Sequence, residues 1–238
     1  MRLPKEIILP ACDYEHHIFE PAQATRASRL PPARSRGSSR GAVVHPKSRT
    51  CIVYESSWEC KLIYRLLART DVVDVWDQPP KVTFKDFDGK KRDHTFDFLV
   101  TFEDGFRIAV AFKPFARVEK IGFLATLKLI ASQLSPSFAD AVRLVSESDL
   151  PKVAVANYQL LHLVREDCDP EADKAVADLL DDGEGPWRIA DLVERSGREG
   201  AGFNAIARLI GKGALDLTAD VAIDYRASVR RGAGLGLR

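Results

Sequence analysis

Asp97 and Lys113 lie in a stretch whose pattern brings a carboxylate and an ammonium group together. Apolar residues alternate with other residues on both sides of Glu103-Asp104-Gly105, which is typical of two strands joined by a tight turn. Gly105 suits the left-handed position of a three-residue hairpin loop. Residues 94–114 are therefore predicted to form a β-hairpin that carries both charged groups.

The length of this loop determines which side chains share a face of the hairpin. A three-residue loop places Asp97 opposite Ala111, with Lys113 next along the same face. A two-residue loop at Asp104-Gly105 would pair Asp97 with Phe112 and turn Lys113 to the other face. The functional interpretation requires the first register. The alternative without a catalytic role is that Asp97 and Lys113 form a cross-strand ion pair, which would contribute only ~0.2–1 kcal/mol to stability.

A third charged group comes from the segment before the hairpin, residues 55–69, whose apolar residues recur with helical spacing. Glu55 and Glu59 fall within the apolar stripe of this predicted helix. A carboxylate that points toward a core is costly unless it is paired or binds a cation. For Glu55, exposure in the first helical turn is an alternative, because the helix dipole favours an acid there.

Glu59, Asp97 and Lys113 together have the chemistry needed to hydrolyse a phosphodiester bond. Carboxylates provide the hard oxygen ligands that Mg²⁺ prefers, and the ion keeps several of its waters. A neighbouring lysine can activate a water molecule and stabilise charge that develops on a phosphate. We therefore expect Glu59 and Asp97 to bind Mg²⁺, with Glu55 as a possible further ligand and Mn²⁺ as a substitute ion.

The N-terminal part of the chain is distinguished by its charge. Residues 21–54 contain no Asp or Glu, although the whole chain of 238 residues has a net charge of only +1. Prolines, glycines and serines in this region favour disorder. Residues 1–50 are predicted to be a basic, largely disordered arm that binds DNA phosphates, and the alternative is a solvated linker. The DNA-binding residues expected in the arm are Arg34, Arg36, Arg40, Lys47 and Arg49.

Around the hairpin, the pattern predicts an α/β core with a mixed sheet flanked by helices, over residues 51–157. The expected order is one helix, three strands, a helix over residues 120–134, a shorter helix over residues 138–144, and a strand over residues 153–156. The sheet would hold the hairpin, and the first helix would bring Glu59 to it.

The last third of the chain has a different pattern. Helices are expected over residues 171–180, 187–195 and 201–210, followed by two wing strands over residues 212–217 and 221–225. This order resembles a winged helix-turn-helix domain over residues 158–226, with a flexible tail over residues 227–238. The last of these helices carries a single arginine, Arg208, so docking of a protein partner is as plausible as DNA reading.

Composition excludes several other classes of protein. No apolar run is long enough to span a bilayer, and no signal peptide follows Met1. The four cysteines form no CxxC pair and are interpreted as reduced thiols of a cytoplasmic protein.

Specific motifs within residues 50–115 resemble the TnsA family of transposon endonucleases, which belong to the PD-(D/E)XK nuclease class. The matching segments are Glu55-Ser56-Ser57-Trp58-Glu59, Asp77-Gln78-Pro79, His94-Thr95-Phe96-Asp97-Phe98-Leu99-Val100 and Ala111-Phe112-Lys113-Pro114. The resemblance implies a restriction-endonuclease-like core and catalytic roles for Glu59, Asp97 and Lys113. It also implies DNA as substrate, with a separate transposase and an ATPase regulator as partners.

The sequence departs from the class pattern at two positions. Phe96 replaces the proline of the class motif, and Ala111 stands where the class has Glu, Asp or, in this family, Gln. Alanine has no side-chain ligand for a metal ion. Two functions therefore remain open: a Mg²⁺-dependent DNA endonuclease, and a catalytically inactive nuclease fold that binds DNA or serves in assembly.

Overall fold

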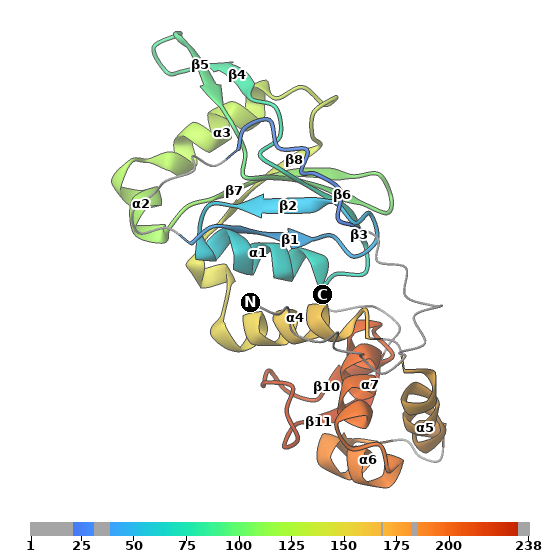
Figure 1. Ribbon diagram of the computed structural model, residues 1–238. Helices are drawn as coiled ribbons and strands as arrows, with labels where there is room; N and C mark the ends of the chain where they lie inside the picture. Colours follow the sequence, from blue (N-terminus) through green and yellow to red (C-terminus); the bar gives the residue numbers. More distant parts are fainter. Residues whose placement is uncertain (1–20, 31–38, 168, 182–184, 233–238) are drawn as a thin grey trace, which may run out of the picture.

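The computed structural model describes residues 21–30, 39–167, 169–181 and 185–232. Figure 1 shows a larger body that contains the central sheet, a long helix α4 beneath it, and a second lobe at the bottom. The protein is a mixed α/β structure in which helices flank a mixed sheet.

The central sheet has four strands in the order β3-β6-β7-β8. Three of them are antiparallel neighbours: β3 (Val72–Asp77), β6 (Phe98–Phe102) and β7 (Arg107–Phe112). The fourth, β8 (Ala141–Val145), runs parallel to β7 and is reached through α2 (Phe115–Lys120) and α3 (Phe123–Gln133). A parallel neighbour requires such a crossover connection.

Both faces of this sheet are covered by apolar side chains. On one face, α1 (Ser57–Leu67) buries Leu62, Ile63 and Leu67 against Phe98, Val100, Val110 and Phe112. On the other face, α3 buries Phe123, Leu127 and Ile130 against the alternate strand residues. The predicted apolar stripe of the first helix is therefore confirmed. Its predicted start is not, because Glu55 precedes Ser56, the residue that caps the helix.

The predicted hairpin register is confirmed for β6 and β7. Phe98 pairs with Val110, and Thr101 pairs with Arg107. The three-residue loop closes with a hydrogen bond from Phe102 N to Phe106 O of 2.9 Å, and Gly105 has a φ of 81°.

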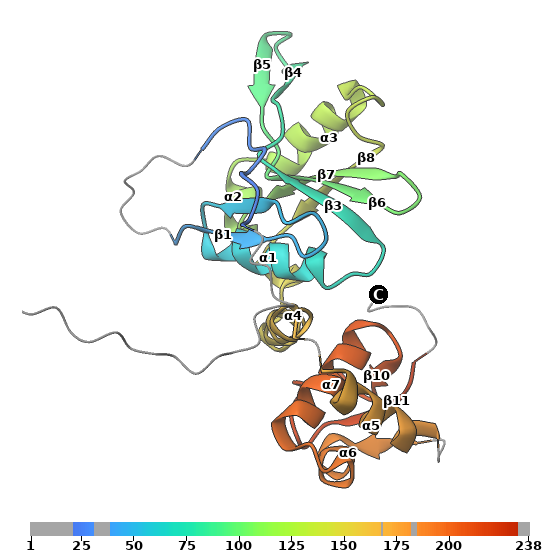
Figure 2. The ribbon, with the colours of Figure 1, turned by 45° about the vertical axis from the view of Figure 1, so that its right-hand side comes forward.

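Two additional hairpins were not predicted as such. The first, β1 (Gly41–Val44) with β2 (Cys51–Tyr54), lies over α1 in Figure 1. The second, β4 (Val82–Lys85) with β5 (Lys91–His94), forms a separate two-stranded sheet that projects from the top of the molecule (Figures 1 and 2). The strand β1 contradicts the expectation that residues 1–50 are largely disordered, at least for this part of them.

Three assignments around the end of the core are wrong. Residues 138–144 were expected to be a helix, but β8 occupies Ala141–Val145. Residues 153–156 were expected to be a strand, but they belong to the helix α4 (Lys152–Val164). This helix also crosses the boundary predicted between residues 157 and 158.

The second lobe contains three helices around a cluster of buried apolar residues, with a small three-stranded sheet at its side. The helices are α5 (Pro170–Asp181), α6 (Ile189–Ser196) and α7 (Glu199–Gly211), and the sheet order is β10-β11-β9. The strands are β9 (Trp187–Arg188), β10 (Leu215–Leu217) and β11 (Ser228–Arg231). The predicted second wing strand over residues 221–225 and the predicted tail from residue 227 are therefore wrong, because β11 lies further along the chain.

Helix α4 connects the two parts of the molecule. It contacts α1 of the first part and α7 of the second. The Asn157 side chain donates to Val221 O at 2.9 Å and accepts from Ile223 N at 2.8 Å, which fixes a loop of the second lobe to α4. No helix in the described part of the chain is long and apolar enough to cross a membrane.

Candidate active site

The candidate active site lies where β6 begins and β7 ends. Asp97 directly precedes β6, and its backbone N–H donates to Val110 O at 2.9 Å. Val110 is also the ladder partner of Phe98, so the regular pairing stops there. The predicted pairing of Asp97 with Ala111 is therefore wrong by one residue. An irregularity of this kind turns a side chain away from the direction that strict alternation would give it.

The backbone holds the Asp97 carboxylate in place. Its Oδ2 atom accepts a hydrogen bond of 2.7 Å from Phe112 N. On its other side, Gln78 N donates to Asp97 O at 2.9 Å. Gln78 has an unusual positive φ of 42° and is buried. The Asp77-Gln78-Pro79 segment thus positions Asp97 through the backbone.

Burial raises the pKa of Asp97 to about 6. The hydrogen bond from Phe112 and the charges of Lys113 and Arg29 oppose this change, and the charge of Glu59 adds to it. Glu59 and Lys113 are therefore electrostatic neighbours of Asp97. A carboxylate with a strongly raised pKa, close to other charged groups, is a recognised mark of functional sites.

Lys113 follows β7 and is fixed through its backbone, which donates to Val145 O at 3.0 Å. Its Nζ atom lies 5.6 Å from the centre of the Phe123 ring, on the α3 side of the sheet. Among the described residues, no carboxylate lies within ion-pairing distance of Lys113. The simple cross-strand ion pair with Asp97 is thus not formed.

Glu59 lies in the first turn of α1, where its side chain has a local role. Ser56 accepts a hydrogen bond from Glu59 N at 3.2 Å, and the Glu59 carboxylate accepts from Glu55 N at 2.7 Å and from Ser56 Oγ at 2.9 Å. This arrangement is a variant of the capping box. Capping therefore gives a structural reason for this acid, in addition to its electrostatic effect on Asp97.

The Glu55 carboxylate is paired with Arg29, a residue that lies within the arm predicted to be largely disordered. Arg29 Nη1 lies 3.2 Å from Glu55 Oε1, and Arg29 Nε donates to Gln78 Oε1 at 3.0 Å. The contact with Glu55 lacks hydrogen-bond geometry, so Glu55 Oε1 is buried without a hydrogen bond from any described residue. An acceptor of this kind suits a cation.

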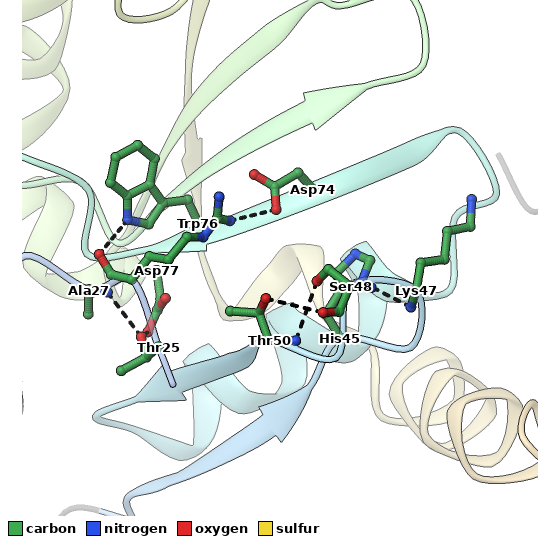
Figure 3. A network of polar contacts seen from close by, with 10 residues as sticks. Thr25, Ala27, His45, Lys47, Ser48, Thr50, Asp74, Trp76 and Asp77 are labelled. Atoms are coloured by element: carbon green, nitrogen blue, oxygen red, sulfur yellow. Dashed lines mark hydrogen bonds and ion pairs between the residues drawn. The ribbon is translucent and has the colours of Figure 1, made fainter. Parts of the chain in front are cut away.

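The segment that carries Arg29, residues 21–30, crosses the edge strand β3. Thr25 Oγ1 donates to Asp77 Oδ2 at 2.7 Å, and Trp76 Nε1 donates to Arg26 O at 2.8 Å. Figure 3 shows Thr25 and Ala27 beside Trp76 and Asp77. Arg29 was missed as a site residue because its neighbourhood has the composition of a flexible arm. The absence of acids between residues 21 and 54 was the sequence feature that could have indicated ion pairs between this segment and acids elsewhere in the chain.

His94 is a second residue that the sequence interpretation did not assign. Its ring lies edge-on to Phe96, with 4.7 Å between ring centres, and 5.9 Å from the Phe123 ring. Burial lowers the pKa of His94, and the charge of Lys113 lowers it further. The neutral imidazole therefore forms part of the apolar wall behind Lys113.

Ala111 lies in the apolar layer beneath α3, packed in the same cluster as Phe96 and Leu99, with 1% of its surface exposed. A long polar side chain at this position would have to displace part of that layer. Alanine thus supplies no side-chain ligand at this position, and the packing around it leaves no free space for a longer side chain that could.

The residues expected to bind DNA are not gathered at this site. Arg34 and Arg36 lie outside the described residues, and Arg40 directly precedes β1. Lys47 and Arg49 lie in the β1–β2 turn, at the end of that hairpin remote from Glu55. Arg49 pairs with Glu166 at 3.1 Å. These two residues are thus in a structured turn, not in a disordered arm.

The oxygen donors present are of the type that suits Mg²⁺, but they are partly engaged within the protein. Within residues 21–30, 39–167, 169–181 and 185–232, no three His, Cys, Asp or Glu side chains are gathered so as to hold a metal ion. The charges of Glu59 and Lys113 both act on Asp97, and Glu55 is adjacent to Glu59 through its backbone.

No protein-family model matches the chain, and no curated protein is significantly similar to it.

Proposed function

We propose that this protein is a Mg²⁺-dependent DNA endonuclease similar to the TnsA type. The observation that carries the proposal is the position of Asp97. It stands at the break between β6 and β7, with a pKa of about 6, under the influence of both Glu59 and Lys113. The order of helix, three antiparallel strands, helix and parallel strand supports the same class, because Asp97 at the start of β6 and Lys113 after the end of β7 then lie at the same end of the two central strands.

In the proposed mechanism, Asp97 and Glu59 would hold the metal ion through carboxylate oxygens, and Glu55 would be a further ligand if its contact with Arg29 were released. The ion would supply positive charge that acidifies a bound water and stabilises a pentacoordinate phosphate. The Phe112 N–H orients the Asp97 carboxylate. Lys113, whose ammonium group forms no ion pair with a carboxylate among the described residues, would hold the attacking water or the scissile phosphate.

The second lobe is proposed to be a winged helix-turn-helix domain that docks a protein. Its third helix, α7, contains only one basic residue besides its C-cap, Arg208, which is buried and pairs with Asp173 at 2.5 Å. A helix whose arginine is used inside the domain is poorly suited to DNA phosphates. A transposase or an ATPase regulator is the proposed kind of partner, and the cytoplasm the proposed compartment.

A second candidate function is a catalytically inactive nuclease fold that binds DNA or serves in assembly. The burial of Ala111 in the apolar layer favours this candidate, because no side-chain ligand can come from that position. The capping role of Glu59 favours it too, since this acid has a structural reason to be present.

A cleavage assay separates the two candidates. Supercoiled plasmid is incubated with the wild-type protein and Mg²⁺ or Mn²⁺, and compared with Asp97→Asn and Lys113→Ala. We expect both variants to lose cleavage, while Asp220→Asn and Lys152→Ala, which change exposed residues away from the site, retain it. Cleavage that survives both site variants would exclude the assigned site. If the wild type binds DNA but does not cut it, even with candidate partner proteins added, the scaffold function is favoured.

A further inference from the structure

The β4–β5 hairpin is the part of the first body that projects furthest from the sheet (Figures 1 and 2). It pairs with no other strand, and almost every residue from Lys85 to Asp93 is exposed. A long exposed strand pair of this kind adds little to the core, which suggests a role outside it.

The hairpin is nevertheless rigidly built. The Asp86 carboxylate accepts hydrogen bonds from Asp88 N at 3.0 Å and Lys90 N at 2.8 Å, and its other oxygen accepts from Arg92 at 3.0 Å. Next to the turn, where Lys85 ends β4, the Gln133 side chain of α3 both donates to and accepts from the Lys85 backbone, at 3.0 and 2.9 Å. A preorganised element loses less entropy when it binds a partner.

Among the described residues, ion pairs within the hairpin leave three lysines and one acid, Asp88, without a charged partner, so the charge that remains is positive on balance. Lys81 pairs with Asp93 and Arg92 pairs with Asp86. The remaining lysines, Lys85, Lys90 and Lys91, are exposed, and no ion pair involving them occurs among the described residues. They surround the tip of the hairpin, where Phe87 is 72% exposed.

The β6–β7 hairpin, which belongs to the central four-stranded sheet, provides a contrast. Its turn also exposes an aromatic residue, Phe106, at 43%, but the turn residues beside it are Glu103 and Asp104. Of these two hairpins, the β4–β5 hairpin is the one that combines an exposed aromatic ring with lysines that have no ion pair among the described residues.

The β4–β5 hairpin is also connected directly to the candidate active site. His94 is the last residue of β5, and Asp97 follows three residues later in the chain. The turn lies at the opposite end of β5 from His94, so a duplex bound at the turn would extend along the hairpin toward Asp97 and Lys113.

We infer that the β4–β5 hairpin is a DNA-binding ribbon that enters a groove of the duplex beside the scissile phosphate. The inference rests on the proposed function for its choice of DNA as the ligand. The major groove of B-DNA is about 12 Å wide and admits a two-stranded ribbon. Lys85, Lys90 and Lys91 would contact phosphates on either side, and Phe87 would contact bases or sugars within the groove.

Binding of a fluorescein-labelled DNA duplex to the full chain, measured at several KCl concentrations without divalent metal, tests the ribbon. The variant Lys85→Gln/Lys90→Gln/Lys91→Gln should bind about 10-fold or more weakly, and its plot of log affinity against log salt should be shallower by about 0.9 for each lost phosphate contact. Phe87→Ala should weaken binding without changing that slope, because it removes no charge.

Matched controls are available in the same chain. Lys90→Gln is compared with Lys152→Gln, an exposed lysine on α4, and Phe87→Ala with Phe106→Ala on the acidic hairpin. Unchanged thermal unfolding would show that the variants are folded. Wild-type affinity and salt slope in the triple variant, or equal losses in the control variants, would overturn the inference.

The outcome can be distinguished from that of the proposed function. If the wild type cleaves DNA and the ribbon variants bind as well as it does, the ribbon inference fails and the endonuclease stands. If the wild type does not cleave but the ribbon variants lose binding, the endonuclease fails and the ribbon stands. A wild type that does not bind DNA would exclude both.

Discussion

Asp97 accepts a 2.7 Å hydrogen bond from the backbone of Phe112, although strict β-pairing would have placed it opposite Ala111. The offset arises because Val110 on β7 is opposite two successive residues: its carbonyl accepts the hydrogen bond from Asp97 N, and it is also the ladder partner of Phe98. It brings an acid that burial makes hard to ionise into the electrostatic reach of Glu59 and Lys113. The predictions below follow from this arrangement.

Replacement of Asp97 by Asn should stabilise the metal-free fold at neutral pH while it abolishes cleavage. The pKa of Asp97 is about 6 in the folded protein, above its ordinary value of 3.8. A raised pKa means that the acid's contribution to stability is fully present below pH 3.8 and is lost as the pH rises through 6. The gain in Asp97→Asn at pH 8 is therefore roughly 3 kcal/mol at most.

Urea unfolding of Asp97→Asn and wild type at pH 5 and pH 8 measures this effect. Asn keeps an oxygen that can accept the hydrogen bond from Phe112 N, so the two proteins differ in the ionisable group and not in this hydrogen bond. Asp220→Asn, which changes an exposed acid and keeps Asp97, should have the same change in stability between the two pH values as the wild type. A wild-type protein whose stability does not fall between pH 5 and pH 8 relative to Asp97→Asn would contradict the raised pKa.

Arg29→Ala should raise the pKa of Asp97 further and move the acidic limb of the cleavage profile to higher pH. The positive charge of Arg29 lowers the pKa of Asp97 in the present structure. The same change frees the Glu55 carboxylate from its 3.2 Å contact, so metal affinity should increase. NMR titration of the Asp97 carboxyl and calorimetric titration with Mn²⁺ measure the two effects.

Arg26→Ala is the matched control for Arg29, because it lies in the same segment but pairs with Asp74 at 2.6 Å. It should leave the titration of Asp97 and the metal affinity unchanged. Equal effects from the two variants would indicate that loosening of residues 21–30, and not the Arg29 charge, is responsible.

Two substitutions of Glu59 distinguish its role in capping α1 from its proposed role in metal-dependent cleavage. Glu59→Ala should lower the free energy of unfolding by about 1 kcal/mol, because the α1 cap loses its carboxylate acceptor. Glu59→Gln keeps an oxygen for the cap and should retain most of the stability, but it should lose metal-dependent cleavage. It should also lower the pKa of Asp97, since the Glu59 charge raises it. Full activity in Glu59→Gln would leave capping as the function of this residue.

Introduction of an acid at position 111 tests whether the missing ligand limits the site. Ala111→Glu should destabilise the protein by roughly 1–3 kcal/mol, because it inserts a polar side chain into a packed layer. It should nevertheless increase the affinity for Mn²⁺. Ala109→Glu, in the same apolar cluster two residues earlier, should cause the loss of stability without the gain in metal binding. Equal metal affinity in both variants would mean that position 111 does not reach the site.

Short-range patterns predicted the hairpin well and the end of the core poorly. Loop length and the placement of Gly105 were enough to predict the register of β6 and β7, because a tight turn leaves few ways to pair the strands. The same reasoning failed by one residue at Asp97. Hydrogen bonds from Gln78 and Phe112 hold it there, and both donors are distant in sequence.

The errors at β8 and α4 have a different origin. The run Val153-Ala154-Val155-Ala156 alternates as a strand does, but Pro151 starts a helix whose buried side Val155 joins. Ala141–Val145 is covered on both faces, so its pattern could not be told from that of a buried helix. Arg29 was assigned to a flexible arm because nothing local indicates the contacts with Glu55 and Gln78.

The continuous helix α4 has a consequence for the distance between the proposed cleavage site and the proposed partner-binding lobe. Because one helix contacts both α1 and α7, with Asn157 fastening the loop around Val221 and Ile223, the second lobe is held at a set offset from Asp97. A partner bound to that lobe would be delivered to the DNA at a constant number of base pairs from the cut. Interrupting α4 should spread the distribution of cleavage positions without reducing the rate of the chemical step.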